Sequence, residues 1–481
     1  MSQKSVTFNL IANGIKTLMS VLFPLITFPY ASRILGADGI GKVNYASSII
    51  TYFSLIATLG INTYAVREGA RIRNDQEKLQ KFVKEIFRIN LCTTFIAYIL
   101  LTVFLCLPFL RGYKDLLVIF SISIVFTTVG IEWLFTIEEE YAYITKRAIL
   151  FQLLSLILLF LLVRDRKDYY WYAALTVISA GGSALMNFWH SRKFVDWKKK
   201  EESYEYRKHL KPIIIIFGTS LATSLYMTMD TTMLGAMKGD RAVGIYTAAT
   251  KINLVINTLI GTISSTILPR VSFYIGNGKK REYEELMKVS MDILFMIAIP
   301  AAVGMMCTSD VSILLFSGKE FLGGVTAANI LAVKIVIGAV NRVMAYQICI
   351  PYKKDKEVLV STVCGAVFNL GANLFFIHLF GVEGAAIATL LSEVVVYIVL
   401  LRYSKKIIDV KKFYYRCPVY LSICIGFFFI RWGVNQITSN VVLCLAFTVI
   451  ICVGFYFGIL LLIKDPYLNN YRKKIFLFIK K

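Results

Sequence analysis

Runs of predominantly apolar residues recur along the whole 481-residue chain, separated by short polar segments. Each run is about 20 residues long, and a helix rising about 1.5 Å per residue would let it cross a hydrocarbon core of about 30 Å. Apolar and polar residues do not alternate with a period of two, which argues against a membrane β-barrel. The pattern predicts an all-α polytopic membrane protein with fourteen spans. The predicted spans are 10–31, 43–63, 85–107, 115–135, 145–163, 170–190, 212–236, 242–266, 287–308, 326–350, 358–380, 383–403, 413–432 and 441–463.

Composition and charge agree with this pattern and add an orientation. The chain is 57% hydrophobic and only 17% charged, whereas soluble domains are nearer half apolar and a quarter charged. The net charge is +23, and about three times as many Lys and Arg residues flank the spans on the side of the N-terminus as on the other side. We therefore expect both termini to be cytoplasmic and nucleic acid not to be a partner. The first span lacks a small-residue cleavage site, so we expect a retained helix.

Two pairs of similar segments suggest an internal repeat. LGADGIGKVNYASSI (35–49) resembles LGAMKGDRAVGIYTAATKI (234–252), and YAALTVISAGGSALMNF (172–188) resembles GAAIATLLSEVVVYIVL (384–400). An even number of helices per half would give both halves the same orientation in the membrane. We predict a six-helix lobe at 1–211, a second at 212–412, and an additional helix pair with a basic cytoplasmic tail at 413–481. The alternative is a chance pattern of small residues.

Two polar links have the pattern of amphipathic helices. In 73–90, the apolar residues Leu79, Phe82, Val83, Ile86 and Phe87 fall on one helical face, and Lys78, Lys81, Lys84 and Glu85 fall on the other. Such a helix can lie in the membrane interface with its cations near lipid headgroups. The link 279–290 is a shorter counterpart in the second half. Each is either a membrane-anchored lever or simply a solubilised connection.

Charged residues inside the predicted spans indicate the chemistry. They are Lys16, Lys251, Lys334, Arg342, Glu132, Asp230, Asp292 and Glu393. Each such charge costs about 2.5 to 3.5 kcal/mol at mid-helix, so eight cannot all face lipid. Glu132 and Asp292 lie near span ends and can be interfacial. The deeper Lys251, Lys334, Arg342 and Glu393 favour a water-filled cavity rich in cations, which would suit an anionic cargo such as a diphosphate.

The first span is interrupted by two prolines. Pro24 and Pro29 each remove a backbone donor, so we predict that the helix bends there and that both residues act as a hinge. Arg33 follows at the outer end, at one mouth of an alternating-access cavity, or else simply extends to the headgroups. Gly36, Gly39 and Gly41 fit a tight outer turn better than a phosphate-binding loop, because no strand precedes them.

Nothing in the sequence predicts catalysis or a metal centre. The three histidines are far apart, the nine cysteines form no Cys-x-x-Cys pair, and no nucleotide-binding loop motif occurs. We therefore expect a transporter without a cofactor.

Three stretches carry a family resemblance: FPLITFPYASRILGADGIGKVNYASSI (23–49), GINTYAVREGARIRND (60–75) and YMTMDTTMLGAMKGDRAVGIYTAATKI (226–252). They resemble bacterial polysaccharide repeat-unit flippases (Wzx-type), in the polysaccharide transporter branch of the multidrug/oligosaccharidyl-lipid/polysaccharide superfamily. The resemblance implies two six-helix lobes in a V-shaped, MATE-like arrangement around a cationic cavity, with two extra C-terminal helices. The implied activity moves undecaprenyl-diphosphate-linked oligosaccharides from the cytoplasmic to the outer leaflet of the bacterial cytoplasmic membrane by alternating access. It would be driven by an ion gradient, of H⁺ or Na⁺, or by the membrane potential. Implied partners are membrane lipids, a polysaccharide polymerase and other assembly proteins.

The resemblance and the charge pattern together give a set of candidate residues. Arg33, Asn44, Arg67, Asp230 and Lys251 come from the family motifs, whereas Lys16, Lys334, Arg342 and Glu393 come from the charge pattern. The predicted cavity residues are Lys16, Arg33, Asn44, Lys251, Lys334 and Arg342; Arg67 is the predicted gate; Asp230 and Glu393 are the predicted ion-coupling residues.

Three alternatives to this function remain at this point. A multidrug exporter of the related efflux branch would favour an acidic, aromatic cavity, which the excess of buried cations disfavours. A lipid II flippase would often carry an extra cation cluster in its second span, and 43–63 has none. A polysaccharide polymerase would need large outer loops, and the loops here are short.

Overall fold

The computed structural model describes residues 6–199 and 203–466, and these residues are helical almost throughout, without a β-strand among them. The predicted basic tail at 467–481 lies outside the described residues. The helices are α1 (Val6–Thr58), α2 (Ile61–Ile72), α3 (Gln76–Leu105), α4 (Lys114–Val129), α5 (Glu132–Ile137), α6 (Tyr141–Leu162), α7 (Tyr169–Gly181), α8 (Ala184–Ser191), α9 (Arg207–Lys238), α10 (Asp240–Gly276), α11 (Lys280–Phe316), α12 (Val325–Val343), α13 (Asp355–Ser404), α14 (Cys417–Ile437) and α15 (Val441–Leu462).

Many of these helices can cross a membrane. Ten helical segments of the described chain are long and apolar enough to do so, and the segments 14–72 and 355–404 each hold two predicted spans. Within them the backbone leaves helical geometry at Gly36 (φ 67°) and Gly381 (φ 57°), angles that favour glycine. Gly381 falls in the two-residue gap predicted between spans 358–380 and 383–403. The prediction of an all-α polytopic membrane protein is confirmed.

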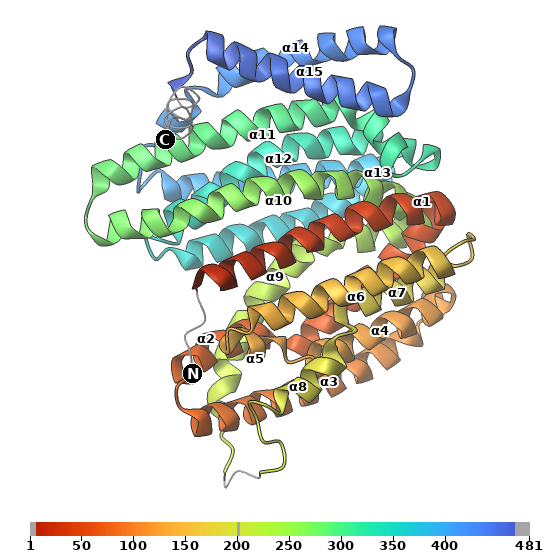
Figure 1. Cartoon of the computed structure of the whole chain (residues 1–481), viewed down its shortest axis with the longest axis vertical. Coiled ribbons are helices and arrows are strands. Elements are labelled where there is room, and N and C mark those ends of the chain that lie inside the picture. The colour runs from red at the N-terminus through yellow and green to blue at the C-terminus, as the bar shows by residue number, and fades with distance from the viewer. Residues whose placement is uncertain (1–5, 200–202, 467–481) are drawn as a thin grey trace. The chain divides into compact units, whose positions relative to one another are not determined.

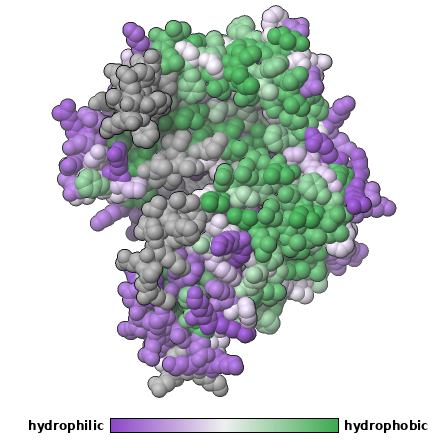
Figure 2. Space-filling model, viewed as in Figure 1, coloured by the Kyte–Doolittle hydropathy of each residue, from purple (hydrophilic) through white to green (hydrophobic). Residues whose placement is uncertain are grey.

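The chain divides into two compact units, Met1–Gly244 and Ile245–Lys481. In the second unit, α11, α12 and α13 lie side by side, and α14 and α15 form an antiparallel pair against α11 (Figure 1). In each unit, an apolar surface lies between hydrophilic margins at the ends of the helices (Figure 2). The first unit includes α9, which the sequence analysis placed at the start of the second lobe. The three-part division at 211 and 412 stays a prediction.

A buried polar network holds α9 in the first unit. The His209 Nε2 atom of α9 lies 2.8 Å from Glu85 Oε2 of α3, and its Nδ1 atom lies 2.7 Å from the Tyr64 hydroxyl of α2. The backbone N–H of Glu205 donates to the second Glu85 oxygen at 2.8 Å. All three side chains are buried. Because buried polar groups are costly when they lose a partner, this network fixes the start of α9 against α2 and α3.

The amphipathic link 73–90 is the first part of α3, not a separate helix in the membrane interface. Asp75 caps α3 by accepting a hydrogen bond from the Lys78 backbone N–H (3.1 Å), and the helix then continues to Leu105. The predicted apolar face is buried, but it packs against protein. Lys84 and Glu85, predicted on the polar face, are buried as well. The link 279–290 is likewise part of a longer helix, α11, which begins at Lys280.

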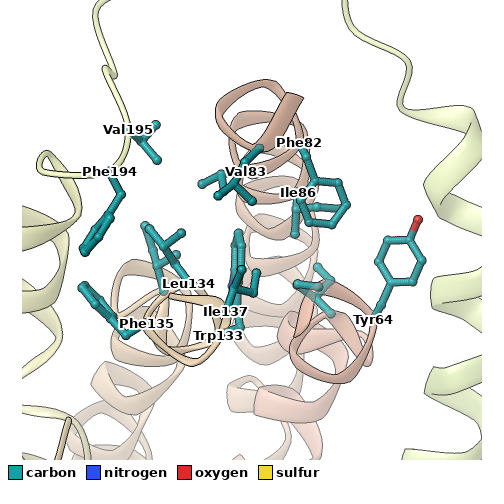
Figure 3. Packing of buried hydrophobic residues seen from close by; sticks show 14 of the residues in the cluster. Tyr64, Phe82, Val83, Ile86, Trp133, Leu134, Phe135, Ile137, Phe194 and Val195 are labelled. Atoms are coloured by element: carbon teal, nitrogen blue, oxygen red, sulfur yellow. The ribbon is translucent and has the colours of Figure 1, made fainter. Parts of the chain in front are cut away.

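The apolar face of α3 belongs to a core cluster to which several segments of the first unit contribute. Figure 3 shows residues 133–137 of α5 lying among Tyr64 of α2, Phe82, Val83 and Ile86 of α3, and the segment 194–195 that follows α8. The cluster therefore packs α2, the first part of α3, α5 and the segment after α8 against one another.

We expect Phe135→Ala to destabilise the first unit. Phe135 is fully buried in this cluster, and truncation of a buried phenylalanine typically costs about 3–5 kcal/mol. Thermal unfolding of the purified protein in detergent should show a clearly lowered Tm. Phe95→Ala on α3 is the matched control, because that side chain is 69% exposed. Equal Tm values for the two variants would contradict the packing in Figure 3.

The two similar segments of the predicted repeat, 35–49 and 234–252, pack against each other. A Cβ atom on Gly41 would overlap the carbonyl oxygen of Asp240, and a Cβ atom on Gly244 would overlap that of Ala37. The contact is reciprocal. Gly41 lies four residues after Ala37 and meets Asp240, whereas Gly244 lies four residues after Asp240 and meets Ala37. Small residues with this spacing let two membrane helices approach at backbone distance. Tyr113 adds a hydrogen bond from its hydroxyl to Asp240 Oδ1 at 2.6 Å.

Candidate functional site

In the second unit, one face of α12 carries two of the predicted cations, Lys334 and Arg342. Lys334, Gly338, Asn341 and Arg342 follow helical spacing, so they share a side of the helix. This helix packs against α13, which supplies Glu393. α12 and the π-helical turn Met344–Cys349 belong to the segment 319–349, which is long and apolar enough to cross a membrane.

Glu393 is a buried carboxylate with partners on α12. Asn341 Nδ2 donates to Glu393 Oε2 at 2.7 Å and to the Glu393 backbone carbonyl at 2.9 Å, and Lys334 Nζ lies 3.9 Å from Oε1. The carboxylate rests over Gly338, where a Cβ would sit 3.5 Å from Oε1. A buried charge needs such compensation, and the lysine and the amide provide it. The Asn341 Oδ1 atom is also buried, and it has no hydrogen-bond partner among the described residues.

The other two predicted cations of the second unit, Lys251 and Arg342, form no ion pair with a carboxylate of the described residues. Arg342 is exposed and lies against α10, since a Cβ on Gly261 would sit 2.6 Å from its Nη1 atom. Lys251 is half-buried on α10, and no carboxylate in the described part of the chain forms an ion pair with it. Tyr246 and Thr389 connect α10 to α13 through a hydroxyl–hydroxyl contact of 3.3 Å. The structure therefore pairs Lys334 with Glu393 and leaves two cations without an acidic partner among these residues.

The first unit brings together Lys16 and Glu132, which sequence reasoning treated separately. Lys16 Nζ forms an ion pair with Glu132 Oε1. Glu132 was interpreted as able to be interfacial because it lies near a predicted span end, which stays a prediction. The structure adds that it bonds to a lysine 116 residues earlier in the chain.

The other predicted residues of the first unit make local contacts. Arg33 is exposed and donates to the Pro29 carbonyl at 3.4 Å, and Asn44 Nδ2 donates to the Ile40 carbonyl at 2.8 Å. Arg67 forms an ion pair with its neighbour Glu68 at 2.9 Å. Asp230 is buried on α9. The roles proposed for these residues stay predictions.

The predicted hinge prolines lie inside α1. Pro24 and Pro29 are both within the helix, and the residue of α1 with non-helical backbone angles is Gly36. The chain therefore changes direction where glycine permits a positive φ, at the turn between the first two predicted spans. The hinge role of the prolines stays a prediction.

Two buried arginines were missed by sequence reasoning. Arg147 of α6 is buried beside Glu132, and Arg431 of α14 lies 2.9 Å from Asp310 Oδ2 of α11 and contacts the Cys444 sulfur of α15. The predicted spans placed both arginines within two residues of a helix end, where a cation is unremarkable. The helices in fact extend further, from Tyr141 and to Ile437. If the predicted spans had ended where the helices do, both arginines would have been recognised as charges inside membrane helices.

Comparison with known proteins identifies the relatives of this chain. Residues 4–274 match the family described as "Polysaccharide biosynthesis protein", and residues 216–375 match the MatE family. The "Putative O-antigen transporter" of Shigella dysenteriae is 24% identical over 393 residues, which cover 79% of this chain and 95% of that protein. The lipid II flippase MurJ of Bacillus subtilis is 23% identical, covering 76% of each chain.

Solved structures share the fold. A structure of the lipid II flippase MurJ aligns with 98% of this chain and all of that one, with a TM-score of 0.75 and 15% identity. An inward-facing MATE-family multidrug transporter aligns with 83% of this chain and 97% of that one, with a TM-score of 0.64 and 16% identity. These likenesses show a MATE-like fold for the chain. The family match covers more than half of the sequence, and the protein therefore belongs to the polysaccharide biosynthesis protein family.

Proposed function

We propose that this protein is a flippase that moves undecaprenyl-diphosphate-linked oligosaccharide repeat units from the cytoplasmic to the outer leaflet of a bacterial cytoplasmic membrane, for surface polysaccharide synthesis. The observation that carries the proposal is a set of cations on helices of the second unit in a member of this family: Lys334 and Arg342 in a segment long and apolar enough to cross a membrane, and Lys251 on α10. The relatives named as an O-antigen transporter and a lipid II flippase support the same class of cargo.

The three cations differ in whether a carboxylate lies beside them. Lys334 is partly compensated by Glu393, so Lys251 and Arg342 retain charge to offset the phosphates of the cargo. Arginine suits this role, because its planar guanidinium can donate two parallel hydrogen bonds to a phosphate. Such charge contacts are stronger in an environment of low dielectric constant than at a surface exposed to water. The sugar and diphosphate would travel past these cations while the lipid tail stays in the bilayer.

Energy would come from an ion gradient and not from a nucleotide. Glu393 and the buried Asn341 Oδ1 atom supply two oxygens that could hold a proton or a sodium ion, and Asp230 of α9 is the second coupling candidate. In this scheme ion binding changes the charge facing Lys334 and so favours one of two alternating-access states. A polysaccharide polymerase and other assembly proteins would take up the exported units.

The test is translocation in proteoliposomes. A fluorescent lipid-linked oligosaccharide diphosphate, lipid II and a cationic drug are each loaded on one side, with and without an imposed proton or sodium gradient. We expect gradient-stimulated movement of the lipid-linked oligosaccharide and no movement of the drug. Preferred movement of lipid II would reassign the cargo, and movement of the drug alone would make the protein an exporter of the multidrug class.

A further inference from the structure

Two helical segments of the first unit, both predicted to span the membrane, are interrupted next to each other. α4 ends at Val129 and α5 begins at Glu132, whereas α7 ends at Gly181 and α8 begins at Ala184. The two breaks are adjacent, because a Cβ on Gly130 would lie 3.4 Å from the Cβ of Ala184. Asn187 Nδ2 donates to the Gly130 carbonyl at 2.9 Å, which satisfies an acceptor that the break leaves open. Interrupted helices at membrane depth mark binding sites in many transporters.

The first break stores backbone strain. Ile131 adopts φ 41° and ψ 39° and is fully buried. A β-branched residue in this left-handed region costs about 1–3 kcal/mol, and such residues cluster at functional sites. The strained turn places Glu132 directly after the break, where its carboxylate reaches both Lys16 and Arg147.

Arg147 lies between the two breaks. Its Nη1 atom donates to Ser183 Oγ at 2.6 Å, beside the second break, and its Nη2 atom lies 3.6 Å from Glu132 Oε2, beside the first. The side chain is only 6% exposed, and its Nε atom is buried without a hydrogen-bond partner among the described residues. A buried guanidinium donor without an acceptor is costly, and a bound oxyanion would supply the missing acceptor.

The cluster also carries one cation more than it has anions. Lys16 and Arg147 share a single carboxylate, Glu132, so one positive charge stays uncompensated within the group. Arg147 is enclosed, whereas the Lys16 and Glu132 side chains are 37% and 50% exposed. The group is thus closed on one side and open on the other. Lys16 and Glu132 form its exposed side.

We propose that Lys16, Glu132, Arg147 and Ser183 form an oxyanion site in the first unit, distinct from the cations of the second unit, and that Glu132 is its exchangeable counter-ion. A phosphate of the lipid-linked cargo displaces the Glu132 carboxylate from Arg147 and Lys16 and occupies the open acceptor position at Arg147 Nε. Arg147 lies six residues after the first residue of α6, about 9 Å along the helix. That depth suits capture of a headgroup from the leaflet on that side. This inference rests on the proposed function for the identity of the cargo.

Two substitutions should move affinity in opposite directions. The probe is farnesyl diphosphate, titrated into the intact protein in phosphatidylcholine nanodiscs. Arg147→Gln removes a donor and a charge and should weaken binding about tenfold or more. Glu132→Gln removes the competing anion and should tighten binding several-fold. Lys146→Gln, the exposed neighbour on α6, makes the same charge change as Arg147→Gln and should leave affinity unchanged. The Tm of each variant verifies folding.

The outcomes separate this site from the proposed function. Opposite shifts for Glu132→Gln and Arg147→Gln support the site even if the wild type fails to translocate lipid-linked oligosaccharide, in which case only the function fails. Weakened or unchanged binding for Glu132→Gln overturns the counter-ion role even if translocation is normal. In a further titration, part of the phosphatidylcholine in the nanodisc is replaced by phosphatidylglycerol. If the anionic lipid abolishes binding of farnesyl diphosphate, the site belongs to lipid headgroups, and its link to the cargo is overturned.

Discussion

Gly41→Ala is expected to prevent stable assembly of the first unit. A Cβ on this residue would overlap the carbonyl oxygen of Asp240, and a backbone oxygen cannot rotate away as the end of a flexible side chain can. The helices must separate or bend, which costs about 3 kcal/mol or more. Membrane yield and Tm of the purified protein should both fall sharply. Gly244→Ala should behave alike, because it meets Ala37 through the same crossing.

A residue on the same helix provides the control. Gly14 of α1 has no heavy atom within 4 Å of the Cβ position, so Gly14→Ala should be tolerated. The double variant Gly41→Ala, Gly244→Ala should cost less than the sum of the two single changes, since either one already separates the helices. Additive losses would mean that the two glycines do not serve one contact.

Replacing both Lys251 and Arg342 with glutamine is expected to abolish export. Truncating one partner of a charge pair that is held out of water typically costs about 2–5 kcal/mol. In our scheme the exposed Arg342 and the half-buried Lys251 are both covered by the same bound diphosphate, so both losses act on it. The initial rate of lipid-linked oligosaccharide translocation should fall about a hundredfold or more, while folding is kept, because neither cation has an acidic partner among the described residues.

Arg281→Gln serves as the charge-matched comparison. Its side chain lies on α11 of the same unit and is 91% exposed, so its removal should leave transport intact. Each variant is compared at equal amounts of reconstituted protein. Export by the double variant at the wild-type rate would exclude Lys251 and Arg342 from the cargo path, and with them the observation that carries the proposed function.

The fold could be predicted from the sequence where apolar runs end at clear signals. The boundary at Gly381 was located within two residues because a glycine and an acidic residue interrupt two long apolar runs there. The breaks at Gly130–Ile131 and Gly182–Ser183 were missed, because the composition on both sides of each stays apolar. Those breaks depend on tertiary contacts such as the Asn187 hydrogen bond to Gly130, which hydropathy cannot register.

The candidate site was predictable only as a set of unusual residue types. A charge within an apolar run is visible in one sequence, and Lys334 and Glu393 were identified in this way. Which charges pair with each other was not predictable. Lys16 and Glu132, for example, are 116 positions apart, and nothing in a single sequence reports their contact. Glu85 shows the same limit. Helical spacing placed it on a polar face, but His209 and the Glu205 backbone cover that face in the folded chain.

The attachment of α9 through His209 has a practical consequence for dissecting the protein. An N-terminal fragment ending at residue 211 would keep His209 but lose the rest of α9, including Ile213, which is buried in the cluster around Tyr64 and Phe82, and it should aggregate on extraction. A fragment that ends in the turn after Gly276 carries α9 and both sides of the glycine crossing. Split-gene expression and complementation should therefore divide the chain there.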